Sequence, residues 1–338
     1  HQNGMKLMID VVYNHTSPDS WLAQHHPEWF YHKPDGSFGN RIGEWPDILD
    51  LDYGNPGLWD YQIETLKSWA EIVDGFRCDV APLVPLEFWL RARREVETVR
   101  PGCLWLAESV EPEFIRDNRN RGMVSHSDGE LYQAFDLCYD YDIYGDFLSY
   151  VQGKTELTDY VRALERQESI YPADYAKLRF LENHDRPRMA HLFPERRTRL
   201  NWLCWMFFQK GTALLYSGQE WENDHRPDLF DADPIPMEGP APLEGLIRRL
   251  TALKKDPLFE IGAYSLRACP GDVLTAVWQE RRENGKRLIG CFCLRGNPAL
   301  VPVELSDGRY ENLLKPGTFL RVESGLLSLD GNPAVLQS

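Results

Sequence analysis

The chain has 338 residues, of which 43% are hydrophobic and 26% are charged, as in an ordinary soluble globular protein. Its formal net charge of −15 makes it a poor candidate for binding nucleic acid or an anionic membrane surface. No apolar run reaches the ~18 residues that a membrane-spanning helix needs. A neutral partner such as a sugar fits this composition, and the length suits one large domain with a smaller one attached.

The cysteines argue against a zinc or redox motif. Their number, 7, is odd, and no C-x-x-C pair occurs. Several lie inside apolar runs, so we expect buried free thiols in a reducing compartment, which favours the cytoplasm.

The first elements are a strand, an excursion and a helix. Residues 6–12 (KLMIDVV) form a short β-branched apolar run, which predicts a buried strand. Residues 13–57 are polar, aromatic and rich in proline, which predicts an excursion lobe rather than a helix. Apolar residues at helical spacing follow over 59–73.

Strands and helices then alternate. We expect further strands at 76–80, 104–107, 133–137, 178–181 and 213–216. We expect helices at 86–99, 111–121, in one long region ending at 166, at 196–209 and at 243–255.

Such alternation is typical of β-α units around a parallel sheet. A (β/α)8 TIM barrel needs eight units, and six strands precede residue 257. We therefore interpret 1–257 as a catalytic barrel lacking its first two β-α units, with the excursion lobe after the third barrel strand. An open doubly wound sheet is the alternative, but no G-x-G-x-x-G turn follows any strand. Short strands separated by Gly, Pro, Asn and Asp over 258–338 predict a C-terminal antiparallel β-sandwich domain.

Acidic residues stand where the predicted strands end, which is where catalytic groups of a barrel lie. They are Asp10, Asp79, Glu108 and Asp185. Arg77 and Asp79 are two residues apart on one strand and face the same way, so Arg77 is expected to keep Asp79 ionised. Apolar neighbours before Glu108 predict a raised pKa and a protonated acid. A single strand-end acid is more often a cap or an ion-pair partner, but several at one end of a barrel indicate glycoside hydrolysis by two carboxyl groups.

These segments resemble the signature blocks of the α-amylase family of glycoside hydrolases (family 13). The matching segments are residues 10–15 (DVVYNH), 75–80 (GFRCDV), 106–110 (LAESV), 183–185 (NHD), 46–52 (PDILDLD) and 211–220 (GTALLYSGQE). They follow the order of the family and run along nearly the whole chain.

The resemblance implies a retaining mechanism. Asp79 would be the nucleophile, Glu108 the general acid and base, and Asp185 the carboxylate that steadies the transition state. It also implies that His15, His184, Arg77 and Asp10 contact or orient the sugar.

The implied substrates are α-linked glucose oligosaccharides or polysaccharides. Ala81-Pro82-Leu83 stands where many α-amylases carry a Lys-His pair, which argues against a long-chain endo-amylase. The sequence leaves open hydrolysis, transglycosylation on the same substrates, and an inactive member with a binding role. If two β-α units are missing, we expect this chain alone to be inactive.

No cofactor is required by this chemistry. The resemblance places Asn14 and Asp47 where the family often binds a structural Ca2+, but two residues do not make a cage of 6–8 oxygens. Aromatic residues of the excursion could stack on sugars, although packing is their commoner role; they are Trp21, Trp29, Phe30, Tyr31, Phe38 and Trp45.

Overall fold

The computed structural model describes residues 1–43, 45–282 and 285–338. The chain forms two compact units, one of His1–Gly145 with Glu168–Lys177, the other of Asp146–Gln167 with Leu178–Ser338. Each unit is described by itself. The predicted domain boundary at residue 257 concerns a different division and stays a prediction.

A parallel sheet organises the first unit. Strands β1 (Met8–Val11), β4 (Gly75–Cys78), β5 (Leu104–Ala107) and β6 (Leu137–Tyr139) pair in this order. Gly75 permits the close approach of β5, because a Cβ there would lie 2.7 Å from the carbonyl oxygen of Leu104. The carboxyl ends of all four strands therefore lie along one edge, where the strand-end acids were predicted.

The fourth strand begins later than the predicted range 133–137. Ser127 and Glu130 form a capping box that starts α5 (Asp128–Leu131), and a turn continues to residue 134. The strand therefore starts at Leu137.

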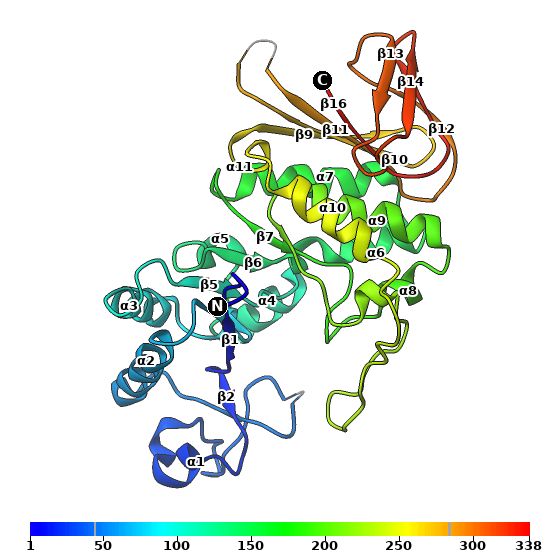
Figure 1. Ribbon diagram of the computed structural model, residues 1–338. Coiled ribbons are helices and arrows are strands. Elements are labelled where there is room, and N and C mark those ends of the chain that lie inside the picture. Colours follow the sequence, from blue (N-terminus) through cyan, green and yellow to red (C-terminus); the bar gives the residue numbers. More distant parts are fainter. Residues whose placement is uncertain (44, 283–284) are drawn as a thin grey trace. The chain divides into compact units, whose positions relative to one another are not determined.

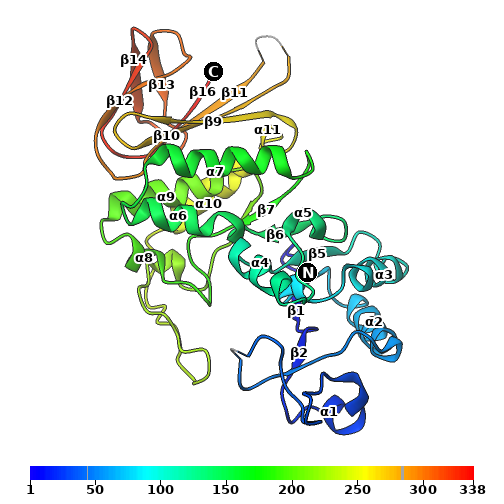
Figure 2. The ribbon, with the colours of Figure 1, turned by 180° about the vertical axis from the view of Figure 1, so that it is seen from behind.

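Helices α2 (Pro56–Ala70) and α3 (Leu86–Glu97) lie side by side next to these strands (Figures 1 and 2). Asn55 caps α2 by accepting a hydrogen bond from the Gly57 N–H, with Pro56 at the first position. The core below them contains fully buried Phe76, Trp89 and Trp105. Helix α4 (Pro112–Asn120) follows β5.

The excursion forms a small lobe with its own core. Strands β2 (His15–Thr16) and β3 (Leu49–Asp50) pair antiparallel, and α1 (Trp21–His25) lies between them in sequence. Trp29 and Phe30 are buried with Leu58 in a separate cluster, so these two aromatic residues pack rather than face solvent. Trp21 is exposed.

The second unit contains most of the remaining helices. They are α6 (Tyr144–Val151), α7 (Leu157–Ile170), α8 (Met189–Leu192), α9 (Arg196–Phe208), α10 (Glu244–Lys254) and α11 (Leu258–Ile261). The predicted single helical region ending at 166 is in fact two helices, broken near Gly153, whose φ is 72°. Strand β7 (Lys177–Arg179) pairs in parallel with β8 (Thr212–Ala213).

Two four-stranded antiparallel sheets complete this unit, which confirms the predicted C-terminal β domain. One has the order β16-β11-β10-β9 and the other β12-β15-β14-β13. The strands are β9 (Ala263–Cys269), β10 (Val273–Gln279), β11 (Arg287–Cys293), β12 (Ala299–Pro302), β13 (Gly308–Glu311), β14 (Phe319–Glu323), β15 (Leu326–Leu329) and β16 (Ala334–Gln337). Their shared core includes Val273, Val301 and Leu327, each 0% exposed. The first sheet packs on α9, where Phe208 contacts Phe292.

All seven cysteines are buried and free, as predicted. Among the described residues, none of the helices combines the length and the apolar character that crossing a bilayer demands.

Candidate active site

Arg77 is the centre of a carboxylate cluster in the first unit. It lies on β4, and its Nη1 donates to both oxygens of Asp10, at 2.9 and 2.7 Å, and to Asp79 Oδ1 at 2.7 Å. Asp10 comes from β1, and its main chain is registered directly opposite Arg77. The adjacent strands thus bring together three of the predicted residues.

Glu108 joins this cluster from the end of β5. Its Oε1 forms an ion pair with Arg77 Nη2, and its Oε2 accepts from the Val80 N–H at 2.9 Å. Val80 has φ 39° and ψ 42°, a left-handed conformation that is unfavourable for a β-branched residue. The strained turn directly after Asp79 therefore aims a backbone donor at the second carboxylate, as is common at active sites.

The pKa of Arg77 reflects both its burial and the negative charges around it. Burial alone would lower the pKa of Arg77, but the negative charges of Glu108, Asp10 and Asp79 raise it, so the guanidinium stays protonated. The ring of Tyr139 lies over it, 5.9 Å from the guanidinium carbon. Because Asp79 and Glu108 contact two nitrogens of one guanidinium, they lie close together on one edge of the sheet.

The third predicted acid lies in the second unit, beyond the end of β7. The Asp185 N–H donates to Asn183 Oδ1 at 3.0 Å, and Asp185 Oδ2 lies 3.2 Å from His184 Nε2. Both side chains are about two-fifths exposed, at 39% and 42%. They are accessible to a ligand, unlike their neighbour Glu182, which is 1% exposed.

A buried ion pair supports this strand end. Arg188 Nη1 donates to Glu182 Oε1 at 2.6 Å and to the Ser217 carbonyl at 2.9 Å, while its Nε donates to the His225 carbonyl at 2.7 Å. The ring of Tyr216 lies 4.4 Å from the guanidinium carbon. Arg188 thereby ties the end of β7 to the segment that follows β8.

The loop after β8 is held in shape and carries an exposed aromatic residue. Arg226 Nη2 donates to the Asp185 carbonyl at 3.0 Å. His225 Nε2 lies 2.8 Å from Asp233 Oδ1, and Asp228 accepts from the Phe230 N–H at 2.7 Å. Phe230 is 86% exposed, and its N–H is hydrogen-bonded to Asp228.

His15, predicted to bind sugar, lies on β2 in the excursion lobe. Its Nδ1 is 3.3 Å from Asn14 Nδ2, and its ring lies 5.9 Å from that of Trp45. It is partly buried, so Trp45 and His15 form a small aromatic pair at the surface of this lobe.

The two residues predicted to bind calcium differ in burial. Asn14 is buried, but Asp47 is exposed, and the buried acid of this segment is Asp50. Burial raises the pKa of Asp50, whose Oδ1 has no hydrogen-bond partner among the described residues. Its Oδ2 accepts from the Arg41 N–H at 2.6 Å and lies 3.7 Å from Arg41 Nη1. A guanidinium thus stands beside this carboxylate, and the calcium assignment of Asn14 and Asp47 stays a prediction.

Sequence reasoning missed three supporting residues: Tyr139, Arg188 and Asp50. Tyr139 and Arg188 act through partners distant in sequence, which a single strand end does not reveal. Asp50 pairs with Arg41 inside the excursion. For Arg188, the available signal was an R-P-R sequence directly after the NHD segment.

Parallel strands that end in an arginine-linked carboxylate pair, followed by an antiparallel β domain, are typical of a barrel with its polar groups at the carboxyl ends of the strands. The family comparison agrees with this class. Residues 1–238 match the model of the alpha amylase catalytic domain, and residues 266–336 match that of the bacterial alpha amylase C-terminal domain. The chain belongs to the α-amylase family, and its fold is that family's TIM barrel with a C-terminal β domain.

The chain is similar to the crystal structure of an alpha-amylase from Lactobacillus plantarum, with 46% sequence identity and a TM-score of 0.96. The match covers 100% of this chain and 79% of that one. Alpha-amylase MalA of Haloarcula japonica is 27% identical, covering 68% of this chain and 34% of the relative. An alpha-1,4-glucan:maltose-1-phosphate maltosyltransferase of Rhodospirillum rubrum is 28% identical. The match covers 53% of this chain and 24% of the relative. The chain thus spans about a third or less of the length of these two curated relatives.

Proposed function

We propose that this chain belongs to a retaining glycoside hydrolase that cleaves α-glucosidic bonds in maltooligosaccharides or related α-glucans. The observation that carries the proposal is the sharing of one guanidinium, that of Arg77, by Asp79 and Glu108. A close pair of carboxyl groups, about 5–5.5 Å apart, is what retention of configuration requires.

In the proposed mechanism, an oxygen of Asp79 attacks the anomeric carbon while the bond to the leaving oxygen breaks. Glu108 gives its proton to that oxygen, and a covalent glycosyl-enzyme forms. Water then attacks the anomeric carbon, passes a proton to Glu108 and releases Asp79. Arg77 holds the Asp79 carboxylate in place through the hydrogen bond from its Nη1.

Asp185 and His184 are proposed to bind hydroxyl groups of the reacting sugar. Their exposure and their placement at the end of a barrel strand support this role. Asp10 holds Arg77 from the other side, so its proposed role is to position the arginine as well as to contact sugar.

Transglycosylation on the same substrates is the second candidate. The maltosyltransferase among the relatives favours it, since that protein is named for a transfer reaction. The two functions share every step up to the glycosyl-enzyme and differ in whether water or a sugar hydroxyl resolves it. An inactive binding protein is disfavoured, because all three acids are present.

Phe230 supports a sugar-binding surface next to Asp185. Its loop is anchored through Arg226 to the Asp185 carbonyl, and an exposed ring on a fixed backbone suits stacking on the apolar face of a glucosyl unit. We assign to Phe230 the stacking of a substrate unit beyond the reacting sugar.

No metal is proposed for this reaction. Arg41 supplies positive charge beside Asp50, which is the buried carboxylate of the excursion.

The test is the time course of products from maltoheptaose, followed by chromatography on the full-length polypeptide that contains this chain. Shorter maltooligosaccharides support hydrolysis, and products longer than the substrate support transglycosylation. If maltoheptaose, isomaltose and sucrose are all left intact, the enzymatic proposal is wrong.

A further inference from the structure

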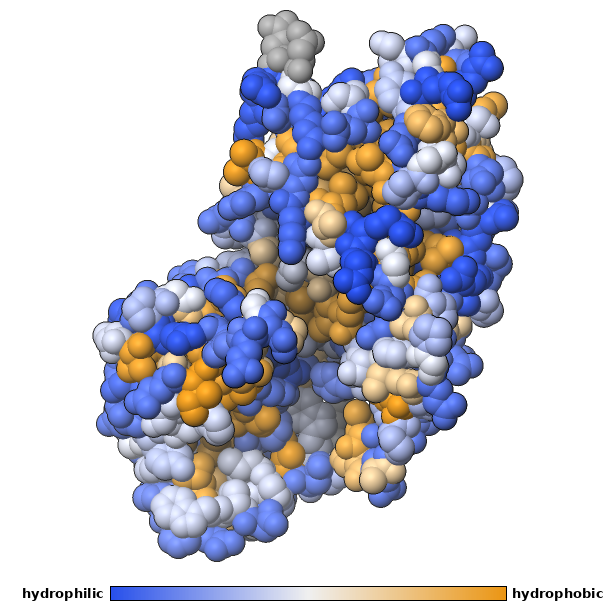
Figure 3. Space-filling view, viewed as in Figure 1, coloured by the Kyte–Doolittle hydropathy of each residue, from blue (hydrophilic) through white to orange (hydrophobic). Residues whose placement is uncertain are grey.

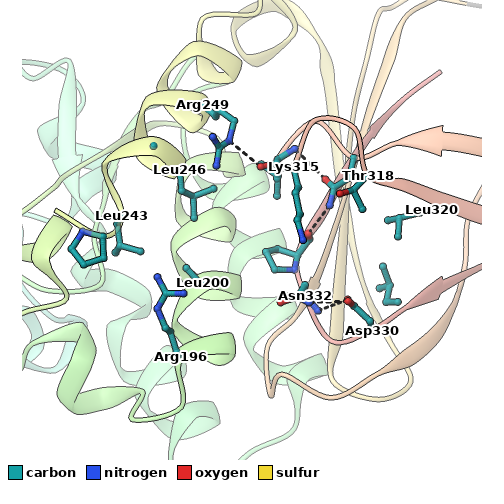
Figure 4. Close-up of a pocket in the computed structure, with 16 residues that line it drawn as sticks. Arg196, Leu200, Leu243, Leu246, Arg249, Lys315, Thr318, Leu320, Asp330 and Asn332 are labelled. Atoms are coloured by element: carbon teal, nitrogen blue, oxygen red, sulfur yellow. Dashed lines mark hydrogen bonds between the residues drawn. The ribbon is translucent and has the colours of Figure 1, made fainter. Parts of the chain in front are cut away.

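The second unit contains a cavity of about 410 Å³ that includes none of the catalytic acids (Figure 4). It lies between α9, α10 and strands of the C-terminal β domain. This volume falls in the range of about 300–1,000 Å³ that is typical of small-molecule sites.

Leucine is the commonest residue that lines the cavity, and Asn312, Thr318 and Asn332 add polar groups to its wall. In Figure 4, Leu200, Leu243 and Leu246 come from the helical side, and Leu320 faces them from β14. Leu314 and Leu329 also line it, and no aromatic residue does. A glucan site normally offers an aromatic platform, so this interior suits an aliphatic chain better than a sugar.

The rim is basic in a protein that is acidic overall. Its charged lining residues are Arg196, Arg249, Lys315 and Asp330. Arg196 is paired with Glu222, at 2.9 Å. Asp330 accepts from both the backbone and the side chain of Asn332, which lower its pKa against the opposing effect of partial burial.

Arg249 and Lys315 are left without a carboxylate partner in the part of the chain that the structure describes. Arg249 Nε donates to the Leu314 carbonyl at 3.0 Å, which holds the guanidinium at the rim. Its two terminal nitrogens stay available, in the geometry that binds a carboxylate through two parallel hydrogen bonds. In the space-filling view, apolar and strongly hydrophilic side chains adjoin over the region of α10 (Figure 3).

We propose that this cavity is a binding site for an aliphatic carboxylate, with the hydrocarbon chain among the leucines and the carboxylate on Arg249 and Lys315. A net charge of −15 makes nonspecific attraction of an anion to this chain unfavourable. Two unpaired cations over an apolar interior therefore provide charge complementarity to a ligand that is both anionic and apolar. This site is separate from the glycoside chemistry and does not depend on it.

The experiment is calorimetric titration of the full chain with octanoate. Octanol, which has the aliphatic chain without the carboxylate, and acetate, which has the carboxylate without the long chain, are the comparison ligands. We expect octanoate to bind more tightly than either. Arg249→Gln should weaken octanoate binding about tenfold and leave octanol binding unchanged, because one charge-assisted contact is lost.

The matched control is Arg248→Gln. Arg248 is the neighbour of Arg249 on α10, does not line the cavity and pairs with Glu244 at 2.5 Å. It should change octanoate binding less than twofold. Arg249→Lys should restore part of the affinity, which separates loss of charge from loss of the Leu314 contact.

The proposal is overturned if octanoate does not bind the wild-type chain, or if Arg249→Gln and Arg248→Gln weaken it equally. Displacement of octanoate by maltoheptaose would also overturn it, in favour of a glucan site. Thermal unfolding of each variant verifies that the fold is intact.

Discussion

The first unit contains two clusters in which one basic side chain meets several carboxylates, and they differ in kind. Arg77 contacts Asp10, Asp79 and Glu108 at the carboxyl edge of the sheet. Lys177 forms an ion pair with Asp128 and lies 2.7 Å from Asp142.

Exposure separates the two clusters. The side chains of Asp10 and Asp79 are 53% and 19% exposed, whereas those of Lys177 and Asp128 are 0% and 2% exposed. Only the first cluster is reachable by a substrate and adjoins a strained turn. An arginine can hold two carboxylates while leaving parts of them free, whereas the buried lysine is enclosed by its partners. The first cluster is therefore assigned to chemistry and the second to structure.

Removing the proposed nucleophile should have the largest effect. We expect Asp79→Asn to lower kcat/KM for maltoheptaose by about 10⁴-fold or more, because the covalent step is lost. Asp47→Asn, which removes an exposed acid, is the control and should stay within about twofold of wild type. If the variant keeps a kcat/KM within tenfold of wild type, Asp79 is not the nucleophile.

Breaking the buried cluster should act on stability instead. We expect Lys177→Met to lower the free energy of unfolding by about 3–5 kcal/mol, because Asp128 and Asp142 would be left buried without a counter-charge. Urea unfolding at neutral pH measures this. A loss of unfolding free energy below about 1 kcal/mol would show that the Lys177 cluster does not stabilise the fold.

The buried cluster should also make stability depend on pH. Burial raises the pKa of Asp128 to about 6, with Asp142 adding to the rise and Lys177 opposing it. A carboxyl group whose pKa is higher in the folded state binds its proton there first. Its contribution to stability is therefore gained as pH falls from about 7 towards 4.

The measurement is the difference in unfolding free energy between wild type and Asp128→Asn at several pH values. As pH falls from 7 to 4, the unfolding free energy of wild type should rise by about 1–3 kcal/mol relative to that of the variant. A difference that does not change over this range would contradict the assigned shift.

Removing the exposed ring should affect binding more than chemistry. We expect Phe230→Ala to raise KM for maltoheptaose by about fivefold to tenfold with little change in kcat, as stacking of one ring is worth about 1 kcal/mol. Leu300→Ala, at a 62% exposed position on β12, is the matched control. Equal KM values for the two variants would exclude a role for Phe230 in binding.

Removing metal should have the smallest effect. We expect EDTA to leave the melting temperature and the rate unchanged, because Arg41 already stands beside Asp50. Arg41→Gln should lower stability by about 1 kcal/mol, since its side chain is partly exposed. A melting temperature that falls with EDTA and is restored by Ca2+ would contradict the metal-free account.

The sequence predicted the first three strands of the first unit well, because their apolar runs end directly in polar residues. It also predicted that Arg77 and Asp79 share a face, since side chains in a strand alternate strictly. The fourth strand was misplaced because Ala134 and Phe135 suggest a strand together with Leu137, yet a turn follows the short helix that the capping box of Ser127 starts.

The supporting residues could not be predicted in the same way. Lys177 meets Asp128 and Asp142 across separations of 49 and 35 residues, and Arg188 meets the His225 carbonyl across 37. Such pairs depend on how distant segments pack, and local patterns contain no information about that. The long helical region was likewise divided by Gly153, whose positive φ becomes evident only in the structure.

The central claim is that Asp79 forms the covalent intermediate while Glu108 handles the proton. The most direct test is mass spectrometry of the Glu108→Gln variant after incubation with an activated fluoro-sugar of the α-glucose series. The account predicts a glycosyl adduct on the peptide that contains Asp79, and none in the Asp79→Asn variant. An adduct on another residue, or turnover with no adduct at any time, would contradict it.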